Sequence, residues 1–506
     1  MHYEWNDTRA EQDIQKFCTQ VQNVEIVKYK RSLDLGNIPV HKAYEMNAVH
    51  IYVDILNLDE ILVTESGLET EYSHKRALRF FDSHFRAIRY ILNKTDAIFV
   101  DFHNQRLHAV IPRPYGDAED EQMRLDRAVA ISKLIIEVVE TQRKDEGDEY
   151  IPAAEIRIGI DSGIALAVNN GRRSHKEPLF LGNPANHAAK HSAGNDEGIF
   201  LTSNAREILD LSKVTDTKKT KLSNDQIQSS VDRAKLDKEV THQQVIDEVC
   251  GNMKLLKDFS FNRITPPLKG LDFSSLYYKS AKRQEILSIY ADIDGFTNFV
   301  EQNIDSDDGK TNIVRCLHVL RSELDASLSQ DFLGRRVRFI GDCVHGIICE
   351  GTAKTTDYAK TVDVGTEAVS GLRSSFNLAL AILNETFNTD IDLGLSIGYD
   401  FGDNSITRIG KQGESVRCSL GLSTINAETE QQLCQKPDET RIGENAYNHL
   451  SASYRKLFKN RSALNLTFSD IKQVAQAEKN IVQKHSMYDS TSHSNGSILK
   501  AHANLK

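Results

Sequence analysis

The sequence contains no long hydrophobic run. No stretch approaches the 18 consecutive apolar residues that a membrane-spanning helix requires. The N-terminus, MHYEWNDTRAEQD, does not show the basic-then-apolar pattern of a secretory signal. We therefore expect a soluble, cytoplasmic protein that has no membrane partner.

An excess of positive charge is also absent. The chain has 62 Lys and Arg against 72 Asp and Glu, which gives a formal net charge of −10. Nucleic acids and anionic membranes bind basic faces, so we expect no general affinity for nucleic acid. A local basic cleft remains possible.

The seven cysteines show neither CxxC pairing nor zinc-finger spacing. Cys316, Cys343 and Cys349 stand in apolar surroundings. We interpret them as reduced thiols of a hydrophobic core rather than as metal ligands.

What the sequence does contain is a repeat with a long period. Four pairs of segments match in the same order, 237 to 239 residues apart, and chance could explain one such match but hardly four. The pairs are 49–55 with 287–293, 106–111 with 343–348, 156–163 with 393–402, and 181–190 with 420–429. A chain of 506 residues has room for two cores, so the sequence predicts two homologous domains.

Each copy shows the order β-α-β-β-α-β, because apolar residues at three- and four-residue spacing lie between the matched strands. This order predicts an α+β fold with two ferredoxin-like, palm-type domains. The predicted segments are an N-terminal extension (1–44), a first domain (45–212), a charged helical linker (213–282), a second domain (283–485) and a disordered tail (486–506). Within the linker we expect one amphipathic helix near 225–257.

Two carboxylates of the second copy follow strand-like runs. ADIDGFTNF (291–299) places Asp292 before Gly295 and the start of a helix, whose free N–H groups suit a triphosphate. RFIGDCVHGII (338–348) places Asp342 at a hairpin tip, and two neighbouring carboxylates favour a divalent cation between them. Taken singly, a strand-terminal Asp is often a helix cap, and Gly-Asp is often a plain hairpin turn.

Together, ADIDGFT and FIGDC resemble the two metal-binding motifs of class III adenylate and guanylate cyclases. The resemblance implies two divalent cations, Mg²⁺ or Mn²⁺, held by Asp292, Asp342 and the carbonyl of Ile293. It also implies that Gly295, Phe296 and Thr297 lie beside a nucleoside triphosphate. The two domains would then pair within the chain as a pseudo-heterodimer, and the oligomeric state stays open.

The first copy looks like the partner half of such a site. GNPANHAAK resembles the family's asparagine–arginine helix, with Asn186 in the ribose-orienting place and Lys190 in place of the arginine. The second copy has Ile425 and Thr429 at these positions, while the hairpin tip of the first copy has Asn104-Gln105 in place of a metal carboxylate. One composite site would remain, and it would convert a nucleoside triphosphate into a 3′,5′-cyclic nucleotide and pyrophosphate.

The position that reads the base in this family is occupied by Asp101, and the second such position by Leu179. An ionised Asp accepts hydrogen bonds, so it would prefer a donor edge such as guanine N1/N2, uracil N3 or cytosine N4. This pattern is similar to that of the pyrimidine cyclases of bacterial antiphage signalling, although Asp101 could equally be a solvated strand residue. Two other functions remain open, a catalytically inactive nucleotide-binding homologue and a palm-type polymerase.

Overall fold

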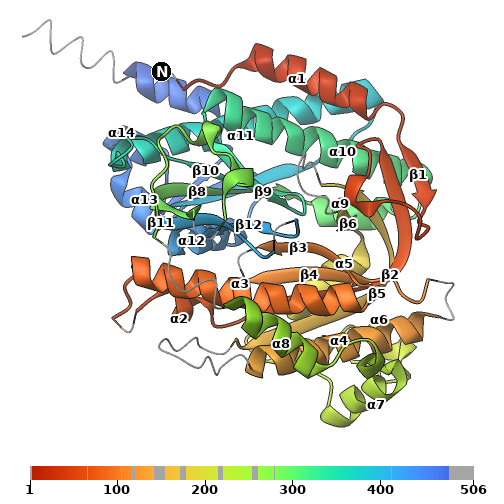
Figure 1. The fold of residues 1–506 in the computed structure, drawn as a ribbon. Helices are drawn as coiled ribbons and strands as arrows, with labels where there is room; N and C mark the ends of the chain where they lie inside the picture. Colours follow the sequence, from red (N-terminus) through yellow and green to blue (C-terminus); the bar gives the residue numbers. More distant parts are fainter. Residues whose placement is uncertain are drawn as a thin grey trace, which may run out of the picture.

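The computed structural model describes residues 3–64, 66–103, 105–115, 120–141, 154–170, 178–214, 220–253, 260–277, 280–411 and 413–477. Within these residues each half of the repeat forms one seven-stranded sheet. The two halves lie one above the other in Figure 1, with the second half above. The tail predicted for 486–506 lies outside the described residues.

The first half has a ferredoxin-like core. Its sheet has the order β3-β4-β2-β5-β6, with β1 on β2 and β7 on β5. The elements are β2 (Lys42–Ile55), α2 (Leu58–Leu62), α3 (Glu71–Lys94), β3 (Ile98–His103), β4 (Arg106–Ile111), α4 (Glu121–Thr141), β5 (Ile156–Asn169), β6 (Pro178–Leu181), α5 (Asn183–Ser192), β7 (Gly198–Leu201) and α6 (Ser203–Ile208).

The second half repeats this arrangement, because its sheet order β14-β13-β11-β8-β10-β9 contains the same four central strands. The predicted pair of ferredoxin-like domains is thus confirmed. The elements are β8 (Lys282–Asp294), α9 (Phe296–Asn303), α10 (Asp307–Ala326), β9 (Arg335–Ile340), β10 (Cys343–Ile348), α11 (Tyr358–Phe387), β11 (Gly394–Ile409), β12 (Val416–Leu420), α12 (Leu422–Gln432), β13 (Glu439–Ile442), α13 (Glu444–His449), α14 (Ala452–Arg455) and β14 (Ser462–Leu464).

Alternation along the central strands decides which residues face the partner domain. In β8, Ile289, Ala291 and Ile293 belong to the hydrophobic core of the second half. Successive side chains of a strand point to opposite faces, so Tyr290 and Asp292 lie on the other face. The strand therefore carries its acidic end residue on the face away from the core.

Glycines on β5 and β11 explain why the 156–163 and 393–402 segments are so similar. A Cβ at Gly159 would lie 2.1 Å from the carbonyl oxygen of Ala188 in α5, and a Cβ at Gly398 would lie 2.1 Å from the backbone N of Gln431 in α12. Each helix therefore packs directly on its strand, and a larger residue would push it away.

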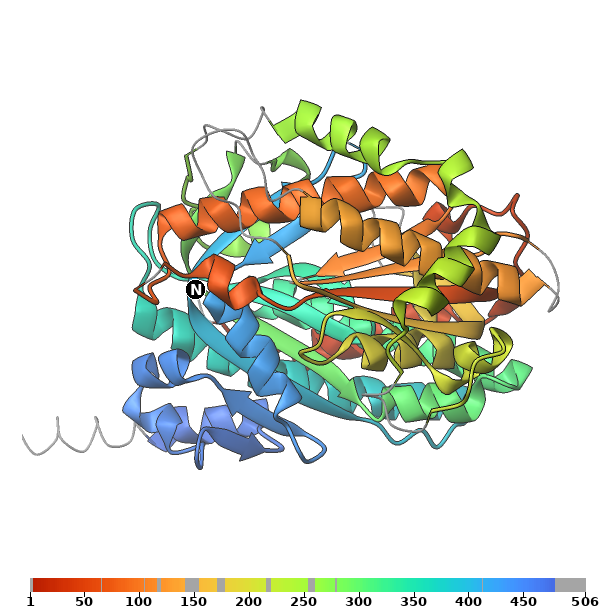
Figure 2. The same cartoon turned by 90° about the horizontal axis from the view of Figure 1, so that it is seen from below.

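The linker contains two helices, so the prediction of one helix near 225–257 was wrong. Helix α7 (Asn224–Ala234) ends at Lys235, which has a left-handed φ of 51°, and α8 (His242–Met253) follows a short 3₁₀ turn. Both helices pack on α4, and α8 also packs on α3. Figure 2 shows this layer from below, with the orange helices α3 and α4 covering the first sheet.

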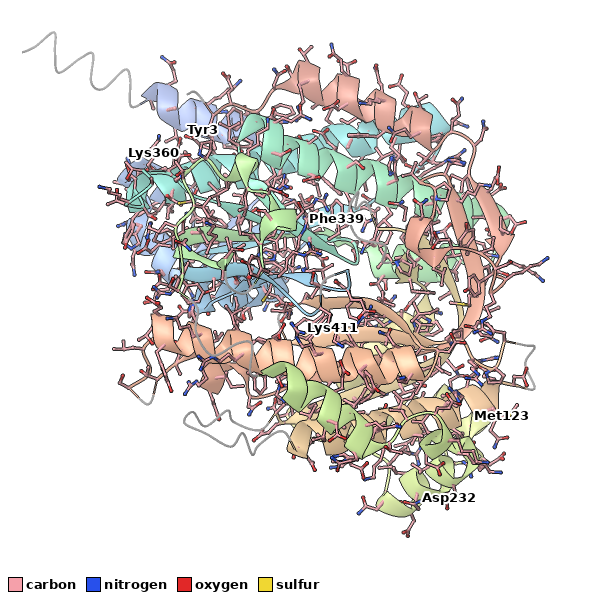
Figure 3. All side chains as sticks on the ribbon, viewed as in Figure 1. Tyr3, Met123, Asp232, Phe339, Lys360 and Lys411 are labelled. Carbon is pink, nitrogen blue, oxygen red and sulfur yellow. The ribbon has the colours of Figure 1, made fainter. Side chains whose placement is uncertain are left out.

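The N-terminal segment joins the two halves. Helix α1 (Asp7–Gln20) packs on α10 and α11 of the second half, whereas β1 (Glu25–Lys28) pairs in parallel with β2 of the first half. Tyr3 lies near Lys360 of α11 (Figure 3). Of the helices in the described part of the chain, none has the length and apolar character needed to cross a membrane.

Candidate active site

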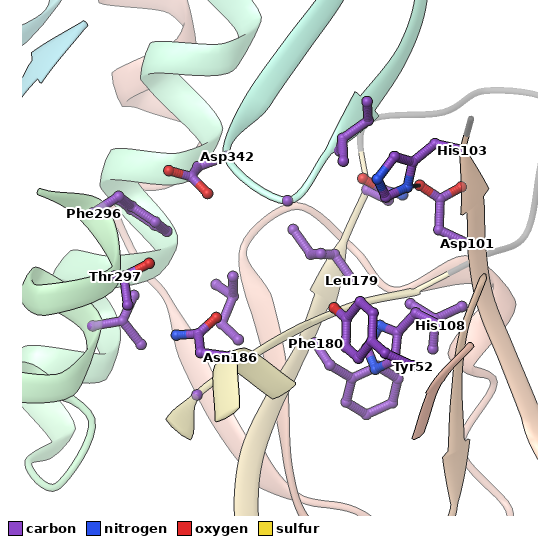
Figure 4. Close-up of a pocket in the computed structure, with 17 residues that line it drawn as sticks. Tyr52, Asp101, His103, His108, Leu179, Phe180, Asn186, Phe296, Thr297 and Asp342 are labelled. Atoms are coloured by element: carbon purple, nitrogen blue, oxygen red, sulfur yellow. Dashed lines mark ion pairs between the residues drawn. The ribbon is translucent and has the colours of Figure 1, made fainter. Parts of the chain in front are cut away.

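A cleft of about 630 Å³, including open solvent at its mouth, lies between the two domains (Figure 4). Six of the ten predicted site residues line it: Asp101, Leu179 and Asn186 from the first domain, and Phe296, Thr297 and Asp342 from the second. Gly295, Asp292, Ile293 and Lys190 are not among the lining residues. Both domains thus contribute to one cleft.

The predicted residues sort into two ends of this cleft. Figure 4 shows Asp342, Thr297 and Asn186 grouped at one end and Asp101 at the other, with Leu179 between them. A molecule that extends along the cleft would meet polar groups at both ends and an apolar side chain in the middle. A nucleotide has polar groups at both ends, the phosphates at one and the edge of the base at the other.

Asp342 occupies the tip of a two-residue hairpin turn. Ile340 pairs with Cys343 across the turn, and Gly341 has a left-handed φ of 61° that favours glycine. Because β10 pairs with β8, with Val344 opposite Ala291, the hairpin brings Asp342 beside the end of β8. The structure thus brings the two predicted metal carboxylates to the same corner of the sheet.

The electrostatics of this corner suit a cation. Burial raises the pKa of Asp342 to about 7. Burial, together with the negative charges of Asp342 and Asp294, also raises the pKa of Asp292 well above its usual value. Two carboxylates that are costly to ionise together become favourable once a divalent cation offsets their charges. The residues present therefore fit a metal.

The protein offers few side chains at this corner that could bind a metal ion. Asp292 Oδ2 accepts a hydrogen bond from Gln431 Nε2 of α12, with 3.3 Å between the atoms. Among the described residues no group of three or more His, Cys, Asp or Glu is placed to hold a metal ion. Mg²⁺ is commonly held by one or two carboxylates together with substrate phosphates, and this donor set matches that pattern.

The turn between β8 and α9 leaves helix N–H groups without a side-chain cap. Gly295 is the N-cap of α9 with a left-handed φ of 79°, and no side chain caps the helix there. Phe296 and Thr297, the first two residues of α9, line the cleft. Uncapped N–H groups at a helix N-terminus suit a phosphate.

Helix α5 presents its two predicted residues differently. Asn186 lines the cleft, as expected for a residue that contacts the substrate. Lys190, four residues later, is exposed and stands outside the lining. The ammonium group is therefore in solvent in this structure.

The end of the cleft at Asp101, which we call the base end, holds an ion pair between the two domains. Arg338 Nη1 of β9 lies 3.1 Å from Asp101 Oδ1 and also donates a hydrogen bond to the carbonyl oxygen of Phe102. Asp101 is only 9% exposed and Arg338 only 3%, so the interpretation of Asp101 as a solvated residue was wrong. Arg338 was not among the predicted site residues.

Arg338 and Asp101 are equivalent positions of the repeat. They lie 237 residues apart, and Asp101 stands opposite His108 on the next strand just as Arg338 stands opposite His345. The pair therefore spans the pseudo-twofold axis that relates the two domains. Aligning the repeat through these strands could have revealed the arginine.

An uncharged aromatic wall runs beside the base end. The Tyr52 ring stacks on His108, with ring centroids 4.1 Å apart, and His50 Nδ1 lies 3.0 Å from His108 Nε2. Burial lowers the pKa of His50 to about 4 and lowers the pKa of His108 as well. Both imidazoles are therefore neutral near pH 7.

Two curated proteins resemble the chain over most of its length. It is 45% identical to a uridylate cyclase of Pseudomonas aeruginosa over 476 residues, which cover 93% of this chain and 91% of that protein. It is 37% identical to a uridylate cyclase of a Rhizobium species over 446 residues, which cover 85% of this chain and 83% of that protein. The chain belongs to the uridylate cyclase family.

The fold of the chain is also similar to that of a solved structure. The crystal structure of a class III adenylyl cyclase-like ATP-binding protein from Pseudomonas aeruginosa matches with a TM-score of 0.89 at 44% identity, covering 94% of this chain and all of that one. No protein-family model matches the sequence. The predicted kinship with class III cyclases is confirmed, and the protein is a nucleotide cyclase.

In this cyclase, the position of the first domain that corresponds to Asp292 is held in an ion pair. Asp54, the counterpart of Asp292, accepts a hydrogen bond from Arg106 Nη2 at 2.7 Å. The guanidinium thus offsets the charge that a metal would otherwise offset.

Proposed function

We propose that this cyclase converts UTP into 3′,5′-cyclic UMP and pyrophosphate. The observation that carries the proposal is the buried Asp101–Arg338 pair at the base end of the shared cleft. The names of the two relatives, both uridylate cyclases, support the same substrate.

The chemistry of the pair fits uracil. The Asp101 carboxylate forms an ion pair with the Arg338 guanidinium, and an ionised carboxylate only accepts hydrogen bonds. Uracil N3–H donates such a bond, whereas the ring N1 of adenine does not. Tyr52 and Leu179 line the cleft beside Asp101, and a single pyrimidine ring needs less of this space than a purine.

At the other end, Asp292, Asp342 and the Ile293 carbonyl would hold two divalent cations, Mg²⁺ or Mn²⁺. The chemistry that these cations supply when bound is a lower pKa of the ribose 3′-OH and an offset of the β- and γ-phosphate charges. The N–H groups at the start of α9 bind the triphosphate, and Asn186 orients the ribose. This places the 3′-oxygen in line with the α-phosphorus.

The reaction forms a bond between O3′ and the α-phosphorus and breaks the bond from the α-phosphorus to pyrophosphate, while the hydroxyl proton passes to solvent. Charge develops on the α-phosphoryl oxygens. We expect Lys190 to turn from solvent toward these oxygens when a nucleotide fills the cleft, as a point charge without the fork of an arginine.

A parallel assay of the four nucleoside triphosphates with Mn²⁺ tests the substrate. We expect UTP to give cyclic UMP and pyrophosphate with the highest kcat/KM, because only its ring N–H and small ring suit both Asp101 and the aromatic wall. The products are identified by mass spectrometry. A higher kcat/KM with ATP, the nucleotide that the related crystallised protein of Pseudomonas aeruginosa binds, would contradict the proposal.

Replacing Asp101 by Asn should lower kcat/KM for UTP by about 10- to 100-fold, because a charged hydrogen bond of about 1.5–3 kcal/mol is lost. Rates with the other nucleotides should fall less, so selectivity for UTP should shrink. Asp96→Asn is a matched control, because Asp96 also pairs with an arginine, Arg31, but outside the cleft. An unchanged preference for UTP in Asp101→Asn would argue against base reading by Asp101.

A further inference from the structure

A buried arginine connects the hairpin that carries Asp342 to the other domain. Arg321 lies on α10 and is only 3% exposed. We propose that Arg321 is a positioning residue that couples closure of the two domains to the placement of Asp342. The inference deepens the proposed function and rests on its metal site.

On one side the guanidinium holds the hairpin turn. Arg321 Nη1 donates a hydrogen bond to the carbonyl oxygen of Gly341 at 2.8 Å. This carbonyl belongs to the peptide unit that joins Gly341 to Asp342, so fixing it orients the backbone from which the carboxylate projects. The guanidinium carbon also lies 4.4 Å from the ring centroid of Phe339, near the middle of the molecule in Figure 3.

On the other side the same guanidinium holds the first domain. Arg321 Nη1 lies 3.3 Å from Asn170 Oδ1, and Nη2 lies 3.2 Å from the carbonyl oxygen of Asn169, where β5 ends. Asn170 is buried and lines the cleft together with Gly341. The planar fork of an arginine can serve acceptors in both domains at once, which a lysine ammonium cannot do in the same geometry.

A pseudo-symmetric contact joins the two domains on the far side of the molecule. There the backbone N of Gly410, at the end of β11, donates to Asp82 Oδ1 of α3 at 2.6 Å, and Arg86 Nη2 donates to the Gly410 carbonyl oxygen at 3.1 Å. On each side of the molecule, a strand end of one domain is therefore held by a helix of the other domain.

This arrangement makes the position of Asp342 depend on the partner domain. When the domains separate, Arg321 loses its acceptors at Asn169 and Asn170, and the freed guanidinium is no longer held beside Gly341. When the domains close, the three acceptors fix the guanidinium and, through it, the turn. Residues that orient metal ligands in this way affect metal affinity although they touch no metal.

The test compares two arginines of the same helix. Arg315 resembles Arg321 in that it donates to two backbone carbonyls, of Val21 at 3.3 Å and Gln22 at 2.8 Å, and packs on a ring, that of Phe387. These contacts join α10 to the N-terminal segment and not to the cleft. Arg315→Lys is therefore the control for Arg321→Lys.

Mn²⁺ binding is measured without nucleotide, by the electron paramagnetic resonance of free Mn²⁺, alongside the Tm without metal. We expect Arg321→Lys to raise the Kd for Mn²⁺ about 10-fold. Arg315→Lys should leave the Kd within about twofold of that of the unmodified protein, even if it lowers the Tm as much as Arg321→Lys does. Equal Kd values in Arg321→Lys and the unmodified protein, or equal shifts in both variants, would overturn the inference.

A double-mutant cycle with Asn170→Ala tests the coupling across the domains. We expect Asn170→Ala to raise the Kd for Mn²⁺ on its own but to add little in the Arg321→Lys background, because the two residues act through one contact. Fully additive effects would contradict the coupling. If Arg321→Lys shifts the Mn²⁺ affinity but UTP is not cyclised, the inference holds and the proposed function fails. If UTP is cyclised and the Mn²⁺ affinity does not shift, the inference fails and the proposed function holds.

Discussion

Replacing Asp342 by Asn should reduce kcat/KM for cyclisation by about 10³-fold or more, which corresponds to about 4 kcal/mol of transition-state stabilisation. The amide keeps the size of the side chain but removes one of the two carboxylates that would hold the cations. Because burial already raises the pKa of Asp342 to about 7, the neutral amide should not destabilise the fold. Steady-state kinetics and the Tm without metal check the two statements separately.

The control for this variant is the equivalent position in the first domain. Gln105 stands there in place of the second metal carboxylate. In the same domain Asp54, the counterpart of Asp292, accepts a hydrogen bond from Arg106. Gln105→Asn should therefore leave kcat/KM within about twofold. Retention of more than a tenth of the activity in Asp342→Asn would mean that Asp342 is not a metal ligand.

Replacing Arg373 by Leu should lower the free energy of unfolding by about 2–3 kcal/mol, because Asp438, whose side chain is 28% exposed, loses its cation and the buried Thr440 hydroxyl loses a donor. Arg373 of α11 is fully buried, bonds to Asp438 Oδ1 and donates to Thr440 Oγ1 at 3.2 Å. The backbone N of Asp438 in turn donates to Asp294 Oδ2 at 3.1 Å, so the loss reaches the end of β8. Urea denaturation followed by circular dichroism measures the change.

A double variant separates loss of charge pairing from loss of packing. In Arg373→Met with Asp438→Asn both charges are absent, and Asn tolerates the left-handed φ of 60° at position 438. We expect this variant to recover at least half of the stability that Arg373→Leu loses. A loss below about 1 kcal/mol in Arg373→Leu would show that the pair of Arg373 with Asp438 contributes little.

The two-domain fold and several of the residues that line the cleft could be predicted from the amino-acid sequence alone. The strand period of two separates Asp292 from the core residues beside it, and the repeated Gly-x-Asp-x-Gly pattern marks the strands on which α5 and α12 pack. These patterns are local, because they depend on residues within one strand or one helix. For the same reason the spacing of Asn186 on its helix could be recognised before its position in the cleft was known.

Contacts between the domains needed the three-dimensional structure. Asp101 meets Arg338, and Arg321 meets Asn170, over separations of 237 and 151 residues. The repeat marks Asp101 and Arg338 as equivalent positions, but it does not show that they touch. No pattern links Arg321 to Asn170, and both contacts depend on how two finished domains dock. The break at Lys235 escaped prediction for a different reason, since a lysine seldom adopts a left-handed conformation and its side chain gives no sign of a turn.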